Sequence, residues 1–161
     1  MEFNVGDKAV HPHHGVGDVT AIEEKEIAGR KVAFYVLNIA DSGTKVMVAK
    51  DAAERVGLRG VVSRRDAKLV LEELRSRTIA VTSQPWNRRH REYMEMLHSG
   101  SLLEVAKVYR DLSLIRHDKD LSFGERELLE KAQTRLVTEI AVSRRCKEER
   151  VGNEIAQILA N

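Results

Sequence analysis

Residues 82–93 hold the side chains best suited to contact a charged partner. Within this stretch lies Trp86, the only tryptophan of the 161-residue chain. Three arginines follow it closely: Arg88, Arg89 and Arg91. Ser83 can cap a helix and Pro85 fits a first helical turn, so the stretch predicts a helix that starts beside Trp86. A bulky ring next to a basic cluster at a helix end is suited to gripping a nucleic-acid backbone.

A second interpretation places the same tryptophan in a hydrophobic core. Trp86 precedes His90 by four residues and Tyr93 by seven, so the three share one helical stripe. Such a stripe is typical of a core-facing surface, because large aromatic side chains are usually mostly buried. The arginines can pair with carboxylates one helical turn away, as on a solvated face. The residues alone leave both interpretations open.

Other groups of polar residues form no catalytic or metal-binding pattern. The histidine-rich segment 11–14 lies between two predicted strands and has no cysteine or paired carboxylate at metal-ligand spacing, which favours an exposed turn over a metal site. Cys146 has no activating partner nearby in the sequence, so a structural role is favoured over a nucleophilic one. We therefore expect a protein that is not an enzyme and that uses no cofactor and no metal.

Composition limits the classes of partner and compartment. The chain has 27 Lys and Arg against 25 Asp and Glu, a net charge of +2, which argues against tight independent binding to bulk nucleic acid. A single cysteine excludes an internal disulfide and indicates a reducing compartment. The sequence shows no signal peptide and no apolar run long enough to cross a bilayer. We expect a soluble cytoplasmic protein that does not bind membranes.

The first 60 residues have the pattern of a small β domain. Short β-rich runs at 8–11, 16–24, 31–39 and 44–49 are separated by turn residues. In residues 32–39 both alternating faces are apolar, which predicts a central strand in a small barrel or strongly twisted antiparallel sheet. One helical turn at 51–56, ended by Gly57, is expected to follow the last strand.

From residue 61 onward the hydrophobic period is helical. We predict helices at 63–76, 85–98, 101–116, 122–145 and 147–159. Three of them open with a serine followed three residues later by a carboxylate, at Ser63, Ser101 and Ser122, as in a capping box. The sequence therefore predicts an α+β protein of two domains: residues 1–60 as a β domain and residues 61–161 as an all-helical bundle.

Several segments together resemble one known family, the CarD/CdnL-type bacterial transcription regulators that bind RNA polymerase. They occur in the family's order and span nearly the whole chain: residues 5–17, 35–37, 56–59, 86–93 and 121–126. The resemblance implies that residues 1–60 form a Tudor-like domain that docks on the polymerase β subunit. It implies that residues 61–161 form a helical domain that contacts DNA.

The resemblance also identifies the strand that faces the polymerase. Relatives dock through an edge of the small sheet, the β-augmentation mode of recognition. In this chain the matching residues are Lys45, Val46, Met47 and Val48. Some relatives carry arginine at the position of Met47 and proline at that of Ala49. Met47 is also suited to filling a core.

For DNA, the resemblance implies contacts at the upstream edge of the promoter bubble. Relatives insert the tryptophan that matches Trp86 into the minor groove as a wedge, and they place basic residues matching Arg88, Arg91 and Arg126 on phosphates. Arg89 is either a further DNA contact or a support for its helix. The resemblance thus implies a regulator that stabilises the open promoter complex through sequence-nonspecific DNA contacts. We expect it to be a monomer, associated with the nucleoid through RNA polymerase.

Two other functions remain open at the level of sequence. Small β-barrels with a similar Val-Gly-Asp turn occur in RNA- or ribosome-associated modules. The helical domain can also serve as an adaptor that holds a second protein on the polymerase and does not touch DNA.

Overall fold

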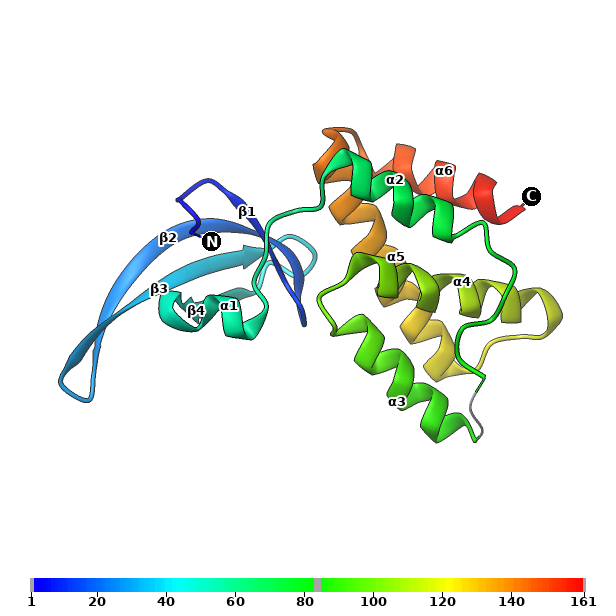
Figure 1. Ribbon diagram of the computed structural model, residues 1–161, viewed down its shortest axis with the longest axis horizontal. Coiled ribbons are helices and arrows are strands. Elements are labelled where there is room, and N and C mark those ends of the chain that lie inside the picture. The colour runs from blue at the N-terminus through cyan, green and yellow to red at the C-terminus, as the bar shows by residue number, and fades with distance from the viewer. Residues whose placement is uncertain (1, 83–84, 161) are drawn as a thin grey trace. The chain divides into compact units, whose positions relative to one another are not determined.

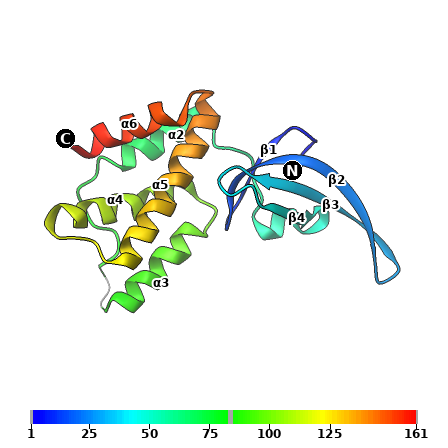
Figure 2. The ribbon, with the colours of Figure 1, turned by 180° about the vertical axis from the view of Figure 1, so that it is seen from behind.

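The protein folds as two compact units, one β-rich and one helical. The computed structural model describes residues 2–82 and 85–160, and the units are Met1–Val61 and Val62–Asn161. Figures 1 and 2 show the strands in the first unit and the long helices in the second. The predicted α+β fold is thus confirmed.

A four-stranded antiparallel sheet forms the first unit. Its strands are β1 (Lys8–His11), β2 (Gly15–Ile27), β3 (Arg30–Ile39) and β4 (Lys45–Ala49), and they are hydrogen-bonded in sequence order. The sheet curls into a Tudor-like half-barrel, as predicted (Figure 1). A 3-10 turn (Lys50–Ala52) and the short helix α1 (Ala53–Val56) follow, and Gly57 ends α1 in the left-handed region with a φ of 95°.

Strands β2 and β3 form a long hairpin that extends past the predicted end of β2. Its turn residues, Ala28 and Gly29, both have positive φ angles, 53° and 79°, as a two-residue mirror-image turn requires. Pairing continues out to Ile27 opposite Arg30. Because this end of the hairpin is polar and exposed, hydrophobic alternation gave no signal for it.

The core of the first unit is built around β3, which pairs with both β2 and β4. Tyr35 and Leu37 are almost completely buried, and the Tyr35 hydroxyl accepts a hydrogen bond from the Phe3 backbone N–H at 3.2 Å. The rest of the core comes from the end of β3, the other three strands, α1 and the segments before β1 and after α1: Phe3, Ala9, Val19, Ile39, Val48, Ala53 and Leu58. The prediction of a central strand at residues 32–39 is therefore confirmed.

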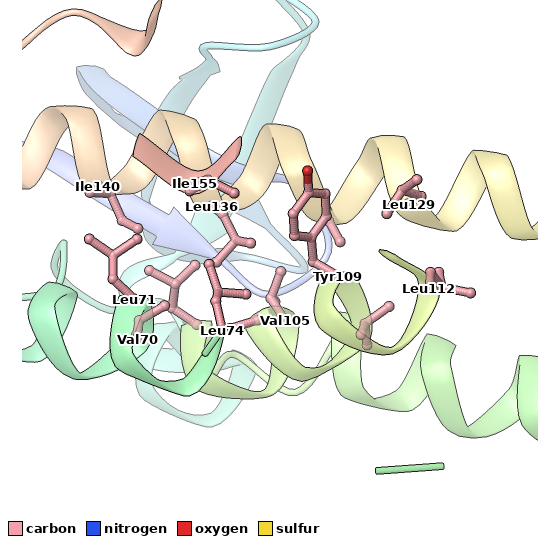
Figure 3. Packing of buried hydrophobic residues seen from close by; sticks show 14 of the residues in the cluster. Val70, Leu71, Leu74, Val105, Tyr109, Leu112, Leu129, Leu136, Ile140 and Ile155 are labelled. Carbon is pink, nitrogen blue, oxygen red and sulfur yellow. The ribbon is translucent and has the colours of Figure 1, made fainter. Parts of the chain in front are cut away.

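Within the described residues, the second unit has five helices around one hydrophobic core. They are α2 (Arg64–Glu73), α3 (Trp86–Leu97), α4 (Leu102–Asp118), α5 (Phe123–Arg144) and α6 (Glu148–Ala160). Figure 3 shows buried side chains of this core from α2, α4, α5 and α6 and from Leu74. Leu112, Leu136 and Ile140 are completely buried. In the described part of the chain, no helix is long and apolar enough to cross a membrane.

Helix starts follow the predicted serine caps at α2, α4 and α5. Ser63, Ser101 and Ser122 each accept a hydrogen bond from the backbone N–H three residues on. The reciprocal bond that completes a capping box is present at Ser122, where Glu125 accepts from the Ser122 N–H. Helix α3 differs, because its cap residue is Pro85 rather than a residue before it. The predicted cap Ser83 lies outside the described residues.

Candidate nucleic-acid interface

Trp86 lies in the first turn of α3, half-buried against the helical core. Its ring stands edge-on to that of His90, with centroids 5.5 Å apart, and its centroid is 6.5 Å from that of Tyr93. Tyr93 is fully buried, whereas His90 is exposed. The predicted stripe of Trp86, His90 and Tyr93 therefore runs from the core to the surface. The indole lies at the boundary between the two.

The indole also packs against the first turn of α5. A Cβ atom added to Gly124 would lie 3.5 Å from Cζ2 of Trp86, which is ordinary van der Waals contact. A methyl group would thus fit between this residue and the ring, so the indole lies beside the backbone of α5 without requiring glycine there. The preceding residue, Phe123, is 71% exposed, so two large aromatic side chains are carried where the first turns of α3 and α5 come together.

Arg89 is largely enclosed by these elements. Its guanidinium carbon lies 5.1 Å from the centroid of the Trp86 ring and 5.7 Å from that of Tyr93. One guanidinium nitrogen is 3.7 Å from a carboxylate oxygen of Glu125, and the side chains of Arg89 and Glu125 are only 12% and 3% exposed. Arg89 therefore links α3 to α5 and supports the indole.

Glu125 connects this pair to the cap of α5. Its Oε1 accepts a hydrogen bond from the Ser122 backbone N–H at 2.9 Å, and the Lys119 ammonium lies 3.8 Å from the same oxygen. These positive and donor groups offset the cost of burying the carboxylate. The start of α5 and the Trp86 end of α3 are thereby fixed to each other.

Three other arginines of the predicted site point to solvent: Arg88, Arg91 and Arg126. Arg88 and Arg91 lie on α3, and Arg126 lies two residues beyond Gly124 on α5. Among the residues that the structure describes, none of the three forms an ion pair. Exposed guanidinium groups without a carboxylate partner remain available for phosphate oxygens.

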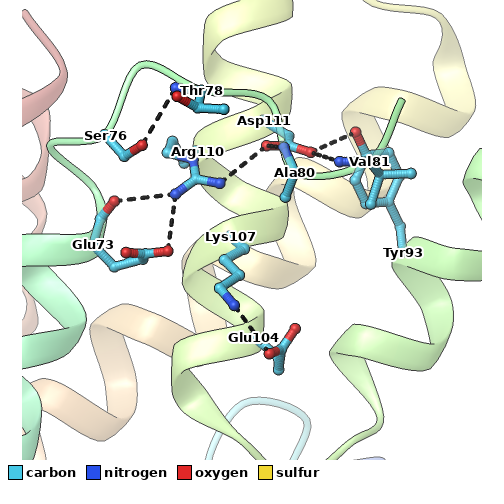
Figure 4. Close-up of polar contacts among 10 residues, drawn as sticks. All are labelled: Glu73, Ser76, Thr78, Ala80, Val81, Tyr93, Glu104, Lys107, Arg110 and Asp111. Carbon is cyan, nitrogen blue, oxygen red and sulfur yellow. Dashed lines mark hydrogen bonds and ion pairs between the residues drawn. The ribbon is translucent and has the colours of Figure 1, made fainter. Parts of the chain in front are cut away.

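A buried carboxylate fixes the segment that leads toward α3 (Figure 4). Asp111 of α4 accepts hydrogen bonds from the backbone N–H groups of Ala80 and Val81 at 2.8 and 2.9 Å, and from the Tyr93 hydroxyl at 3.1 Å. Burial raises the pKa of Tyr93 to about 12, so its hydroxyl stays a donor at neutral pH. One side chain thus anchors both the incoming segment and the middle of α3.

Next to Asp111, the buried Arg110 extends the network to α2. Its guanidinium donates to the backbone carbonyl and the carboxylate of Glu73, at 3.3 and 3.1 Å, and lies 3.5 Å from Asp111. Figure 4 shows these contacts in one row from α2 to α3. The polar network therefore joins α2, α4, α3 and the segment between α2 and α3.

In the first unit, the predicted docking strand β4 is an edge strand. Its side chains alternate between the core and the outside: Val48 is 5% exposed, whereas Met47 is 39% exposed and Lys45 is also exposed. Met47 therefore does not fill the core. In the described part of the chain, backbone hydrogen bonds join β4 to β3 alone.

The opposite edge strand, β1, is partly covered. The backbone groups of Val10 and Arg59 exchange two hydrogen bonds, at 2.7 and 3.1 Å. The segment after α1 thus pairs with β1 and leaves β4 as the more accessible edge.

The histidine-rich segment forms a compact turn between β1 and β2. The ring of His11, which is 8% exposed, lies 4.8 Å from that of His14 between centroids. No group of His, Cys, Asp or Glu side chains suited to a metal ion occurs among residues 2–82 and 85–160.

Both units match families of known proteins. Residues 69–156 match the CarD C-terminal domain, and residues 3–62 match the CarD-like/TRCF RID domain. The chain belongs to the CarD family. CarD-family proteins are transcription regulators that interact with the transcription machinery, so this chain is a CarD-like transcription factor, and the family is not known for enzymatic activity.

Two individual relatives illustrate the CarD-family match. YdeB of Bacillus subtilis (strain 168), a protein proposed to be a transcription factor, is 28% identical over 149 residues, which are 92% of this chain and 97% of YdeB. The solved structure of CdnLNt from Myxococcus xanthus is 44% identical, covering 39% of this chain and 89% of that one, with a TM-score of 0.34.

Three residues around this candidate site were not predicted as part of it from the sequence. Phe123 gave a signal, because it falls on the charged face of α5 with Arg126, Glu127 and Glu130, where an apolar residue is out of place. Asp111 gave a weaker one, as an acidic residue between the apolar residues of α4. Gly124 gave none, because its contact is with a ring 38 positions away in the sequence.

Proposed function

We propose that this CarD-family protein docks on the β subunit of RNA polymerase through its first unit and stabilises the open promoter complex through its second. In this proposal, Trp86 inserts into the minor groove at the upstream edge of the bubble. The observation that carries it is the half-exposed indole between the first turns of α3 and α5, on the same two helices as three exposed arginines that form no ion pair among the described residues.

The wedge acts through a difference in affinity between two DNA states. Inserting an apolar ring beside a base step costs roughly a few kcal/mol of unstacking on intact duplex, and less where the bubble edge has already frayed. Trp86 therefore binds the melted promoter more tightly than the closed one. A preference of ~1.4 kcal/mol shifts the equilibrium tenfold toward the open complex.

The arginines supply contacts that do not depend on sequence. Arg88, Arg91 and Arg126 neutralise phosphates beside the inserted ring, and phosphate contacts carry no base information. Three such contacts give weak, salt-sensitive affinity in free solution. Docking on the polymerase compensates for this weak affinity, because a tether raises the local concentration of the helical unit near DNA to roughly millimolar.

Docking uses the open edge of the sheet. Residues Lys45–Val48 offer their outward backbone N–H and C=O groups to a strand of the β subunit. Val48 holds the strand in the core, while Lys45 and Met47 carry exposed side chains. The backbone supplies affinity and these two side chains supply specificity.

Two further residues take supporting roles in this proposal. Arg89 orients the indole from behind, because its guanidinium is already committed to Glu125 and to the two rings. Phe123, exposed beside Gly124, provides a second apolar surface against the frayed end. The wedge is then a pair of rings rather than one.

The test is the decay of promoter complexes formed with purified polymerase. Trp86→Ala is expected to shorten the open-complex lifetime about tenfold relative to the intact protein, since it removes the ~1.4 kcal/mol preference. An Arg88/Arg91 double alanine variant is expected to shorten it too, with a weaker salt dependence. A matched double variant, Arg65→Ala with Lys131→Ala, removes two exposed charges elsewhere in the same unit and should leave the lifetime within twofold.

The same variants separate this function from that of an adaptor for a second protein. If the Trp86→Ala variant folds normally, binds polymerase and leaves the open-complex lifetime unchanged, the proposal that Trp86 acts as a wedge is wrong. Loss of a protein partner with an unchanged lifetime would then favour the adaptor.

A further inference from the structure

A second basic surface lies at the far end of the helical unit from Trp86. It is a groove of about 710 Å³ between α2, the end of α5 and α6. Figures 1 and 2 show α2 and α6 running side by side at the end of the unit opposite to the start of α5. Five cationic side chains line the groove: Arg64, Lys68, Arg75, Arg144 and Arg150.

Two carboxylates in the groove account for two of these cations. Glu72 lies 3.5 Å from Arg75, one turn away on α2. Glu154 of α6 lies 2.5 Å from Arg144. In the part of the chain that the structure describes, Arg64, Lys68 and Arg150 have no carboxylate partner, so the groove carries an excess of three positive charges.

The three uncompensated cations gather at one end of the groove. Arg64 donates to the backbone carbonyl of Arg144 at 3.1 Å, which places it at the last turn of α5. Lys68 follows Arg64 by one helical turn, and Arg150 lies in the first turn of α6. Arg64 has a structural role, because it caps the C-terminal end of α5. Within the described residues, no ion pair or hydrogen bond gives the charged groups of Lys68 and Arg150 such a role.

The remaining walls of the groove offer little apolar surface. Leu71 and Ile158 reach it but are only 4% and 6% exposed. An amphipathic helix would find almost nothing to bury there. Volumes of roughly 300–1,000 Å³ are typical of small-molecule sites, and guanidinium and ammonium groups are the usual protein ligands of phosphate.

We propose that this groove binds a small anion carrying several linked phosphate groups, of the size of a nucleoside triphosphate. The phosphates are held by Arg64, Lys68 and Arg150, and the rest of the molecule extends along the groove toward Arg75. Gly124 and Arg144 are twenty residues apart on one helix, so about 30 Å separates this site from Trp86. The proposal is therefore independent of the contact between Trp86 and DNA.

Cys146 permits a test within the groove itself, because it lines the groove and is the only cysteine of the chain. The rate of its alkylation is measured on the intact protein with adenosine triphosphate, inorganic tripolyphosphate or adenosine. Both phosphate compounds are expected to slow alkylation at least fivefold at saturation, and adenosine is expected to have no effect. Added salt should weaken the protection, because the recognition is electrostatic.

Matched variants locate the effect. Lys68→Ala and Arg150→Ala should each raise the dissociation constant for tripolyphosphate at least fivefold, measured by calorimetry. Arg65→Ala, an exposed neighbour on α2 outside the groove, should change it less than twofold. Trp86→Ala should bind tripolyphosphate as the intact chain does, so failure of the DNA wedge and failure of this site are distinguishable.

Three results would overturn the proposal. The first is the absence of protection by millimolar tripolyphosphate. The second is an equal loss of affinity in Arg65→Ala, which would indicate general charge attraction. The third is stronger protection by a hexaglutamate peptide than by tripolyphosphate, which would identify a site for acidic protein segments.

Discussion

At the Trp86 site, buried side chains support an indole that is itself partly exposed. Arg89 and Tyr93 fill the space behind the indole, and both touch a buried carboxylate, Glu125 and Asp111 respectively. Burial is the main cause that raises the pKa of Tyr93, because the charged phenolate would be desolvated there. The ring behind the indole therefore stays neutral, and its hydroxyl stays bound to Asp111, over the whole physiological range.

The pKa of Tyr93 predicts how stability depends on alkaline pH. A group whose pKa is raised by folding binds its proton more tightly in the folded state, so its contribution is complete below pH 10 and is lost as pH rises toward 12. Tyr93→Phe should lower the free energy of unfolding by about 1 kcal/mol at pH 8, through loss of the hydrogen bond. Between pH 10 and 12 the free energy of unfolding of the intact chain should fall by up to about 3 kcal/mol more than that of the variant.

Urea unfolding of both chains at several pH values measures this difference. Other groups that titrate in this range are common to the two chains and cancel in the subtraction. A difference in the free energy of unfolding that stays constant from pH 8 to pH 12 would contradict the assignment.

Whole elements are positioned by contacts between residues far apart in the chain. Segment 78–82 has no regular secondary structure, yet two of its backbone N–H groups are bound to Asp111 of α4, thirty residues further on. Through Tyr93 the same carboxylate holds α3. The orientation of α3, and with it that of Trp86, therefore depends on a residue in another helix.

Asp111→Ala is expected to loosen the segment before α3. It leaves the buried backbone N–H of Val81, the partly buried N–H of Ala80 and the Tyr93 hydroxyl without their acceptor, so the free energy of unfolding should fall by about 2–4 kcal/mol. Hydrogen exchange at the amides of Ala80 and Val81 should accelerate beyond what the global loss of stability accounts for. Asp118→Ala, at an exposed site on the same helix, should change stability by less than about 0.5 kcal/mol. Equal exchange rates at these two amides in both variants would disprove the anchoring role.

Secondary structure was largely predictable because local signals agreed with the fold. The serine caps marked the starts of α2, α4 and α5, and the apolar period located each helix to within a few residues. The last three residues of β2, 25–27, were missed, because cross-strand pairing of polar residues leaves no hydrophobic alternation. The stripe of Trp86 and Tyr93 was predictable from helical spacing, whereas the buried carboxylates Glu125 and Asp111, which hold Arg89 and Tyr93, are brought there only by tertiary packing.

At the scale of the whole molecule, charge is nearly balanced. The chain as a whole carries +2, while the residues beyond Gly60 hold nineteen basic against sixteen acidic side chains. This small excess cannot hold the helical unit on DNA at physiological salt. In the proposed function, the covalent link to the sheet unit supplies what electrostatics does not, by keeping the helical unit near the promoter.

Separating the two units should therefore abolish the effect on promoter complexes. Residues 1–61 and 62–161, produced as two polypeptides and mixed, are expected to leave the open-complex lifetime within twofold of polymerase alone, at a concentration where the intact chain is saturating. Circular dichroism of each piece verifies that it folds. Stabilisation by the mixture equal to that by the intact chain would show that the link is not required.

The single tryptophan has a practical consequence for the study of this protein. Because Trp86 is the only indole in the chain, excitation at the red edge of the absorption band, where tyrosine does not absorb, produces emission from this one position. Nucleic acids contribute almost no fluorescence of their own. A titration with a forked duplex therefore records quenching or a spectral shift from the proposed contact itself, with an unlabelled, natural chromophore.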